Sequence, residues 1–306
     1  MRRLHYHRVD VFTDRAFGGN PLAVFANGRG VETETMQAIA KEFNLSETTF
    51  VLPPDDPRHD WRVRIFTPEH ELPMAGHPTV GTSFVLAREH MIRCGVDGER
   101  ETNIVLEEGV GPVPVRVSFE SGEPVFAEMS QPLPTYGPQL TDRKAVAAML
   151  SLGEADVDTS LPLEVVSCGV PFLFVPLRSL DAARRARPRA DLIEQVATDG
   201  VPPEVFIFTR EVESASSTVH SRMFAPGLGI TEDPATGGAS GPLGCYLVRH
   251  RLVACDPAAE IVSEQGIEMG RPSFIRIRIE RQGEDISAVR VGGQCHFMGE
   301  GFIEIQ

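Results

Sequence analysis

The stretch ELPMAGHPTVGTSFVLAR, residues 71–88, recurs in altered form 161 residues later as EDPATGGASGPLGCYLVR, residues 232–249. Five of the eighteen aligned positions are identical, where chance at natural residue frequencies gives about one. Each copy consists of an acidic residue, a proline-containing turn, a glycine and a run of small and apolar residues typical of a buried helix. Because the offset is about half of the 306-residue chain, the repeat predicts two similar lobes.

Segments with the alternation of half-buried strands surround both predicted helices. In the first half, we predict helices at 33–43 and 78–88, and strands at 5–12, 22–25, 48–52, 61–66, 103–106 and 113–119. In the second half, we predict helices at 142–150, 181–187, 190–197 and 239–249, and strands at 163–166, 172–175, 205–209, 218–224, 261–263, 273–279, 288–291 and 302–305. The helices from 78 and 239 are too apolar for a surface position, so we expect an α+β fold in which a curved sheet wraps a buried helix, built twice.

One segment has the composition of a linker. Residues 131–142 contain three prolines and a glycine, which disfavour regular structure. We therefore predict an N-terminal lobe at residues 1–130, completed by a C-terminal strand at about 296–306, and a C-terminal lobe at residues 131–295.

The composition limits the classes of partner. The excess of 43 acidic over 29 basic side chains, a net charge of −14, disfavours nucleic acid, because phosphate binding needs clustered Lys and Arg. The Arg2-Arg3 pair is not followed by an apolar core, and no segment approaches the ~20 apolar residues of a membrane span. Neither a signal peptide nor a membrane partner is expected. The five cysteines form no CxxC pair, which favours free thiols in a reducing cytoplasm.

The repeated element predicts an anion site. A helix start presents unpaired backbone N–H groups and a partial positive charge. Two such starts, near His77 and Gly238, would hold a carboxylate without Lys or Arg if they faced each other across a cleft formed by both lobes. The alternative is that Gly76 and Gly237 only permit tight turns and close helix packing.

Three titratable residues stand near these elements. His77 directly precedes Pro78, which suits the first helical turn, and at an exposed helix start it is a candidate acid or hydrogen-bond donor. Asp233 holds the matching place in the second copy, where an Asx turn or helix cap is the alternative. Glu47 enters a predicted strand, where a solvated edge residue is the usual interpretation.

Several motifs, in order over nearly the whole chain, resemble the PhzF-like phenazine-biosynthesis isomerase family. They are Asn20-Pro21-Leu22-Ala23-Val24, Ser46-Glu47-Thr48-Thr49-Phe50, Arg64-Ile65-Phe66-Thr67-Pro68, Gly76-His77-Pro78-Thr79, Glu232-Asp233-Pro234-Ala235-Thr236-Gly237, Gln265-Gly266, Met269-Gly270-Arg271-Pro272-Ser273 and Val291-Gly292-Gly293. The resemblance implies a diaminopimelate-epimerase-like fold, with two pseudo-twofold related lobes that each wrap a mostly antiparallel sheet around a central helix. It also implies a homodimer that works without cofactor or metal.

The resemblance implies catalytic roles for Glu47, His77 and Asp233, with Glu47 moving a proton between carbons of a dihydro-hydroxyanthranilate ring. Substrate-binding positions fall on Ser46, Gly76, Pro78, Thr236, Gly237 and Gly238. The chain departs from the family pattern twice. Gly238 replaces a frequent serine, which removes one hydroxyl contact, and Ala75 replaces a frequent cysteine.

The leading hypothesis is a cofactor-independent isomerase that shifts a proton on a small carboxylated cyclic metabolite, similar to trans-2,3-dihydro-3-hydroxyanthranilate isomerase. The alternatives are an epimerase or racemase with a 1,1-proton transfer, and a non-catalytic small-molecule binder. A racemase with two thiols is disfavoured because neither repeated turn contains a cysteine. The chain has no dinucleotide, P-loop or nucleophile-elbow motif, and His70-Glu71 with His77 lacks the spacing of a helical zinc motif.

Overall fold

The computed structural model describes residues 1–92, 100–198 and 200–305. The chain divides into two compact units, one formed by Met1–Ser130 with Gly292–Gln306 and the other by Gln131–Val291. Four of the cysteines are free thiols, and Cys94 lies outside the described residues. In the described part of the chain, none of the helices combines the length and apolar character needed to cross a bilayer.

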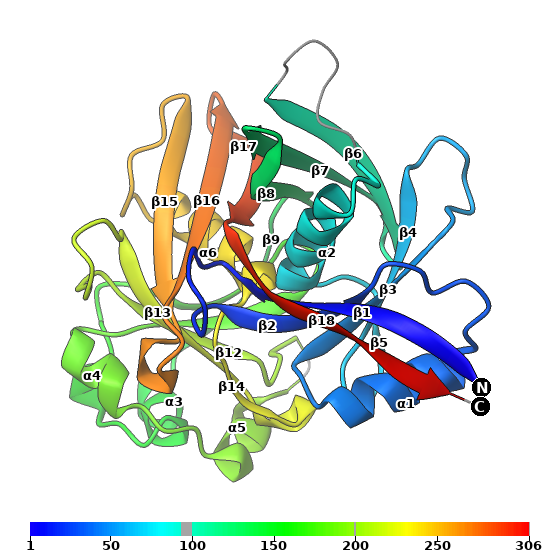
Figure 1. Ribbon diagram of the computed structural model, residues 1–306. Helices are drawn as coiled ribbons and strands as arrows, with labels where there is room; N and C mark the ends of the chain where they lie inside the picture. Colours follow the sequence, from blue (N-terminus) through cyan, green and yellow to red (C-terminus); the bar gives the residue numbers. More distant parts are fainter. Residues whose placement is uncertain (93–99, 199, 306) are drawn as a thin grey trace. The chain divides into compact units, whose positions relative to one another are not determined.

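In its described residues, the first unit consists of a mixed sheet and the helices that pack on it (Figure 1). Its elements are β1 (Arg2–Val11), β2 (Asn20–Phe25), α1 (Thr33–Phe43), β3 (Glu47–Leu52), β4 (Trp61–Phe66), β5 (Glu71–Leu72), α2 (Gly76–Arg88), β6 (Glu101–Glu108), β7 (Gly111–Glu120), β8 (Glu123–Gln131) and β18 (Cys295–Ile305). The strands pair in the order β18, β1, β2, β3, β4, β6, β7 and β8, with β5 also against β4. The pairs β2–β3 and β4–β6 are parallel and the others antiparallel.

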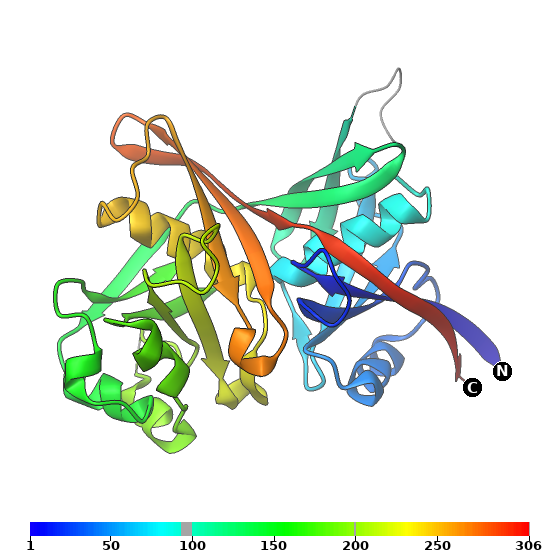
Figure 2. The same cartoon turned by 60° about the vertical axis from the view of Figure 1, so that its left-hand side comes forward.

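Helix α2 is the core of this unit. It contacts β1, β2, β3 and β7, and the sheet curves around it (Figure 2, cyan helix). A Cβ atom on Gly81 would lie 2.6 Å from Val11 and 2.7 Å from Leu22, so the close approach of helix and sheet requires glycine. Helix α1 covers the opposite face of the sheet, where Met36 and Ile39 pack against Phe25, Phe50 and Phe66.

The second unit repeats this topology. Its elements are β9 (Thr135–Leu140), α3 (Arg143–Met149), η2 (Glu154–Asp156), β10 (Leu163–Ser167), β11 (Pro171–Pro176), α4 (Leu180–Arg185), α5 (Ala190–Val196), β12 (Val205–Thr209), β13 (Val219–Ala225), η3 (Pro226–Leu228), β14 (Ile230–Asp233), α6 (Gly237–Arg249), β15 (Ala258–Gln265), η4 (Ile267–Met269), β16 (Ser273–Gln282) and β17 (Asp285–Gly293). The strands pair in the order β9, β10, β11, β12, β13, β15 and β16, with β14 against β13. The parallel pairs, β11–β12 and β13–β15, occupy the same places as in the first unit.

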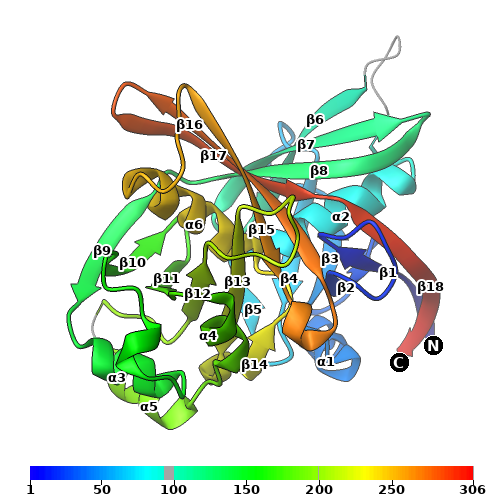
Figure 3. The same ribbon diagram turned by 90° about the vertical axis from the view of Figure 1, so that its left-hand side faces the viewer.

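Helix α6 corresponds to α2, and both have 13 residues. Tyr246 of α6 packs against Phe174 and Phe208 and donates a hydrogen bond to the carbonyl of Pro162 at 2.7 Å. Helices α3, α4 and α5 pack against the other face of β10–β12 around Leu163, Leu173 and other apolar side chains (Figure 3). The sheet of each unit is thus covered on both faces by helices.

The two units also contain equivalent ion pairs, which the aligned residues of the sequence repeat did not reveal. Arg64 on β4 donates two hydrogen bonds of 2.7 Å to Glu71, and Arg222 on β13 donates two of 2.8 Å to Glu232. Each ion pair joins the segment before the central helix to the neighbouring strand, β4 in the first unit and β13 in the second. The α+β fold predicted from the repeat is therefore confirmed at the level of strand order, helix position and this paired contact.

Several elements differ from the sequence predictions. The predicted linker contains β9, which pairs with β10; the prolines are tolerated because the described pairings of β9 are on one side only. Strand β8 carried no prediction. The central helices begin at Gly76 and Gly237, two residues earlier than predicted. The first turn of α2 therefore includes residues 76 and 77, and that of α6 includes Gly237 and Gly238.

Candidate active site

His77 is the second residue of α2, and it is buried, with 3% of its surface exposed. The prediction of an exposed helix start is therefore wrong. Every residue from Gly76 to Ala87 is buried, including those of the first turn. Burial disfavours the imidazolium and lowers the pKa of His77 to about 3. The side chain is thus a neutral imidazole at physiological pH.

Two side chains from neighbouring strands orient this imidazole. Asn20, the first residue of β2, donates from Nδ2 to Nδ1 of His77 at 3.1 Å. Because Nδ1 accepts, the ring proton of the neutral imidazole resides on Nε2. That nitrogen lies 3.3 Å from Oε2 of Glu47. The imidazole and the carboxyl group are thus neighbours, although the angle at Nε2 does not make this contact a hydrogen bond.

Glu47 is the first residue of β3 and is 9% exposed. Strand β3 pairs with β2 on one side and β4 on the other, so the interpretation as a solvated edge residue is wrong. The parallel pairing with β2 places Leu22 opposite Glu47, which brings Glu47 near the end of β2 that carries Asn20. Ser46 directly precedes Glu47 and is half-buried.

A second carboxyl group lies beneath the start of α2 and was missed by the sequence analysis. Glu108, the last residue of β6, is 2.6 Å from the hydroxyl of Thr79, which donates to the carbonyl of Ala75 at 2.6 Å. The hydroxyl has one proton for these two contacts, so when it donates to Ala75, Glu108 donates to Thr79 in its acid form. Burial raises the pKa of Glu108 to about 8, in agreement with a protonated side chain.

In the second unit, Asp233 and Thr236 lie before the start of α6. The hydroxyl of Thr236 donates to Oδ2 of Asp233 at 2.5 Å. Gln265 supports both residues: its Nε2 donates to the hydroxyl of Thr236 and the carbonyl of Asp233, and its Oε1 accepts from the backbone N–H of Thr236. The N-cap residue of α6 is Thr236, and no side chain caps the helix. Asp233 therefore accepts a hydrogen bond from the side chain of the N-cap residue.

The two helix starts have the same scaffold and different chemistry. Ser240 donates to the carbonyl of Thr236 as Thr79 donates to that of Ala75, and Gln265 ends β15 as Glu108 ends β6. Gly238 takes the place of His77 as the second helical residue. Each unit thus contributes a distinct set of polar groups at an equivalent place.

The remaining predicted binding residues also lie at these starts. Gly76 and Pro78 flank His77 in α2, and Gly237 and Gly238 open α6 directly after Thr236. The first N–H groups of a helix have no intrahelical acceptor. Both starts therefore have the backbone chemistry of an anion site.

A change of Gly238 to serine is expected to be tolerated. A Cβ atom there meets, within 4 Å, only the ring of Phe172 at 3.9 Å, and serine has a better helix propensity than glycine. We expect the free energy of unfolding of Gly238→Ser to stay within about 0.5 kcal/mol of the wild type or to rise. Urea denaturation measures it, and Gly241→Ser, whose Cβ would overlap the side chain of Gln131, is the destabilised comparison. A large loss of stability in Gly238→Ser would contradict this geometry.

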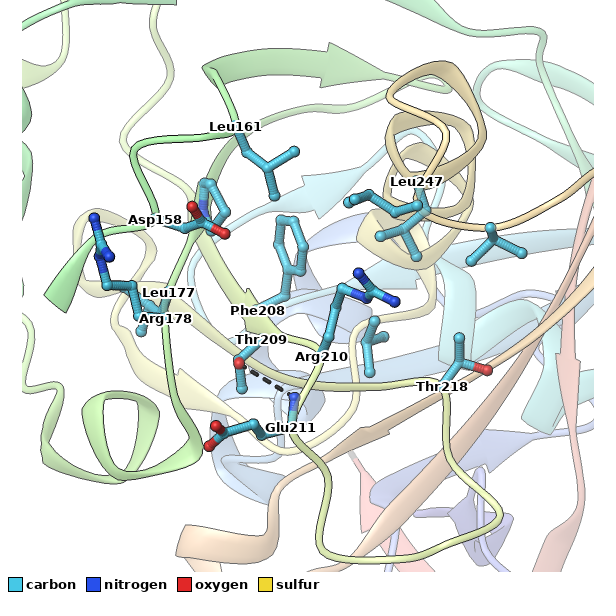
Figure 4. Close-up of a pocket in the computed structure, with 14 residues that line it drawn as sticks. Asp158, Leu161, Leu177, Arg178, Phe208, Thr209, Arg210, Glu211, Thr218 and Leu247 are labelled. Carbon is cyan, nitrogen blue, oxygen red and sulfur yellow. Dashed lines mark hydrogen bonds between the residues drawn. The ribbon is translucent and has the colours of Figure 1, made fainter.

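A pocket of about 380 Å³ in the second unit contains none of the predicted site residues (Figure 4). Two of its charged side chains have structural contacts: Arg178 donates to the carbonyl of Val157, and Glu211 accepts from the backbone N–H of Leu180.

Known proteins match this chain over nearly its full length. The family described as phenazine biosynthesis-like protein, PhzC-PhzF, matches residues 9–301. An uncharacterised isomerase of Mesorhizobium japonicum is 39% identical over 98% of this chain and 99% of that protein. Trans-2,3-dihydro-3-hydroxyanthranilate isomerase of Pseudomonas aeruginosa is 38% identical over 97% and 98%. The structure of a Bacillus anthracis phenazine biosynthesis protein of the PhzF family superposes with a TM-score of 0.87 over 100% of both chains, at 26% identity.

Proposed function

Because the chain belongs to the phenazine biosynthesis-like PhzF family and is an isomerase, we propose that it shifts a proton within a small carboxylated cyclic metabolite. The observation that carries the proposal is the 3.3 Å contact between Nε2 of His77 and Oε2 of Glu47 at the buried start of α2. A carboxylate held there is available as a base for a carbon-bound proton. The relative from Pseudomonas aeruginosa is named for such a substrate, trans-2,3-dihydro-3-hydroxyanthranilate.

In the proposed mechanism Glu47 removes the proton from one carbon and returns it to another. A single carboxyl group suffices because it is neutral after the first step and is then an acid. We assign His77 to the positioning of this carboxylate, and Asn20 holds the imidazole in the tautomer that carries its proton on Nε2. The backbone N–H groups at the helix start stabilise negative charge as the carbanion delocalises towards the substrate carboxylate.

We assign Asp233 to the same reaction, with Thr236 and Gln265 as its positioning residues. The bond from the Thr236 hydroxyl fixes the orientation of the Asp233 carboxyl group. A hydrogen-bonded carboxylate of this kind is suited to bind an amino or hydroxyl group of the substrate. This assignment predicts that substitutions of Glu47 and Asp233 are not additive in their effect on turnover.

Among the described residues, neither helix start offers a thiol for proton transfer. Ala75 and Thr236 precede the two helices, so neither N-cap position holds a cysteine. Cys245 is buried in α6, its Sγ lies 3.9 Å from that of Cys168, and this contact together with burial raises the pKa of Cys245 above the ordinary range. Such a thiol is inert as a base. The carboxyl groups remain the bases of the proposed reaction.

The proposal is tested by incorporation of solvent deuterium. The enzyme is incubated in D₂O with trans-2,3-dihydro-3-hydroxyanthranilate and, separately, with proline, and the products are analysed by mass spectrometry and chiral chromatography. We expect a shifted double bond in the first compound, with Glu47→Gln inactive. Exchange at one carbon with inversion would instead indicate an epimerase. Absence of exchange, together with tight binding of either compound, would indicate a non-catalytic binder.

Gly238 bears on the choice of substrate. If the hydroxyl that many family members carry at this position contacts the phenazine precursor, Gly238→Ser should lower the KM for that compound. An unchanged KM would show that this enzyme holds its substrate by other groups. The comparison is interpretable because the substitution is expected to leave the fold intact.

A further inference from the structure

A cluster of potential metal ligands lies where the two ends of the chain meet, in the first unit. His5 and His7 are two residues apart on β1, so their side chains share one face of the strand. His7 pairs directly with Glu300 on β18. One ligand atom from each of these three residues lies within 4.8 Å of the others.

The distances between the donor atoms resemble those around a tetrahedral ion. A zinc ion with bonds of ~2.0–2.1 Å separates neighbouring ligand atoms by roughly 3.3–3.4 Å. Nε2 of His5 lies 3.3 Å from Oε2 of Glu300, and Nδ1 of His7 lies 3.8 Å from the same oxygen. A fourth donor is close, since Oε1 of Glu89 lies 3.6 Å from Nδ1 of His7. Glu89 is not among the three residues whose donor atoms all lie within 4.8 Å of one another, so its partly exposed side chain must move to complete the tetrahedron.

The buried imidazole of His7 is an independent sign of a missing ligand. His7 is 1% exposed, and its Nδ1 has no hydrogen-bond partner within accepted distance. Burying an unsatisfied polar atom costs about 1–3 kcal/mol. The atom is directed at the carboxylates of Glu89 and Glu300, and a bound cation between them would satisfy all three groups.

We infer that His5, His7, Glu300 and Glu89 form a binding site for a divalent transition metal of the zinc class. Two neutral imidazoles and two carboxylates balance the charge of such an ion, and imidazole nitrogen excludes the oxygen-seeking Mg²⁺ and Ca²⁺. The neighbouring cavity of about 570 Å³, lined by His5, His7 and Glu89 among others, provides an entry path. Arg88, which directly precedes Glu89, stacks its guanidinium over the ring of Phe297, with 4.1 Å between the guanidinium carbon and the ring centroid.

The role of this site is structural. Glu89 directly follows the last residue of α2, whereas His77 lies at the first turn, so about 20 Å of helix separates the ion from the proposed base. The ion would join the first strand, the last strand and the end of the central helix. A metal ion that binds the native fold and not the unfolded chain raises the stability of the protein by mass action.

Titration of tag-free, metal-stripped full-length protein with Zn²⁺ and with Co²⁺ tests this inference. We expect one equivalent to bind, the melting temperature to rise, and Co²⁺ to give a tetrahedral visible spectrum without a thiolate charge-transfer band. His5→Gln and Glu300→Gln, both on partly exposed positions, should weaken binding at least ~100-fold, because loss of a ligand exceeds the 10–100-fold effect of losing its supporting hydrogen bond. His59→Gln is the matched control, since His59 pairs with a single carboxylate, Glu107.

The possible outcomes are distinct. Equal binding by wild type, His5→Gln and Glu300→Gln, a thiolate band, or absence of a one-to-one complex would each overturn the inference. If His5→Gln loses the metal and keeps wild-type turnover, the site is structural as stated. Loss of isomerase activity on stripping, restored by Zn²⁺, would contradict the separation of the two sites.

Discussion

Glu47→Gln is expected to lower turnover by about 10²–10⁴-fold, or roughly 3–5 kcal/mol of barrier, as for the loss of a general base. Glutamine keeps the size of the side chain and a hydrogen-bonding oxygen near Nε2 of His77, so substrate affinity should change little. The measurement is kcat and KM on the substrate identified by deuterium exchange. Retained turnover would remove Glu47 from the mechanism.

The first unit offers a matched control for this experiment. Glu107 also contacts a histidine, with its Oε2 2.9 Å from Nδ1 of His59, and this pair lies outside the proposed site. Glu107→Gln should therefore leave kcat unchanged. His77→Asn should lower kcat less than Glu47→Gln, because the neutral imidazole orients the carboxylate and does not itself take the proton.

Combining the substitutions tests whether the two helix starts serve one reaction. If Asp233 acts on the same substrate as Glu47, Glu47→Gln with Asp233→Asn should cost less than the sum of the single effects on the barrier. Additive effects would indicate that Asp233 acts independently, for example in folding of the turn before α6. Melting temperatures of the three variants separate these cases.

Local patterns were sufficient for most of the fold. The run of small residues after each repeated turn predicted two buried helices, and both lie at the centre of a sheet of the same topology. Alternation located β4 and β12 to the residue. It did not identify β9, where prolines at one edge of the sheet conceal a strand that only its pairing with β10 defines.

The environment of the candidate site depends on contacts between distant segments. Asn20 and Glu47 reach His77 from β2 and β3, 57 and 30 residues earlier in the chain, and their pairing determines that the helix start is buried. No local pattern around His77 reports this. Glu108 had a local signal, since Ile104 and Leu106 alternate with it on the inner face of β6, but a buried acid cannot be told from an exposed strand end without the fold.

Replacing Glu108 with glutamine is expected to remove a large pH dependence of stability. Its pKa is about 8 in the folded protein and 4.5 in the unfolded chain. Between these values the native state binds a proton that the unfolded state has lost, so the free energy of unfolding falls as pH rises, by about 1.4 kcal/mol per pH unit. Over the whole window the loss is at most about 5 kcal/mol, and it ends above pH 8, where both states are ionised.

Glutamine mimics the protonated acid at every pH, because its amide also donates to the hydroxyl of Thr79. Gln265 at the equivalent end of β15 demonstrates that the scaffold accepts this side chain, where it donates to Thr236. Glu108→Gln should therefore match the wild type near pH 5 and exceed its stability near pH 9, as measured by urea denaturation across that range. Glu107→Gln, the neighbouring control, should show no such gain, because the hydrogen bond from His59 lowers the pKa of Glu107. Parallel pH curves for the wild type and Glu108→Gln would mean that Glu108 is ionised in the folded protein, and that the Thr79 hydroxyl donates to it instead of to Ala75.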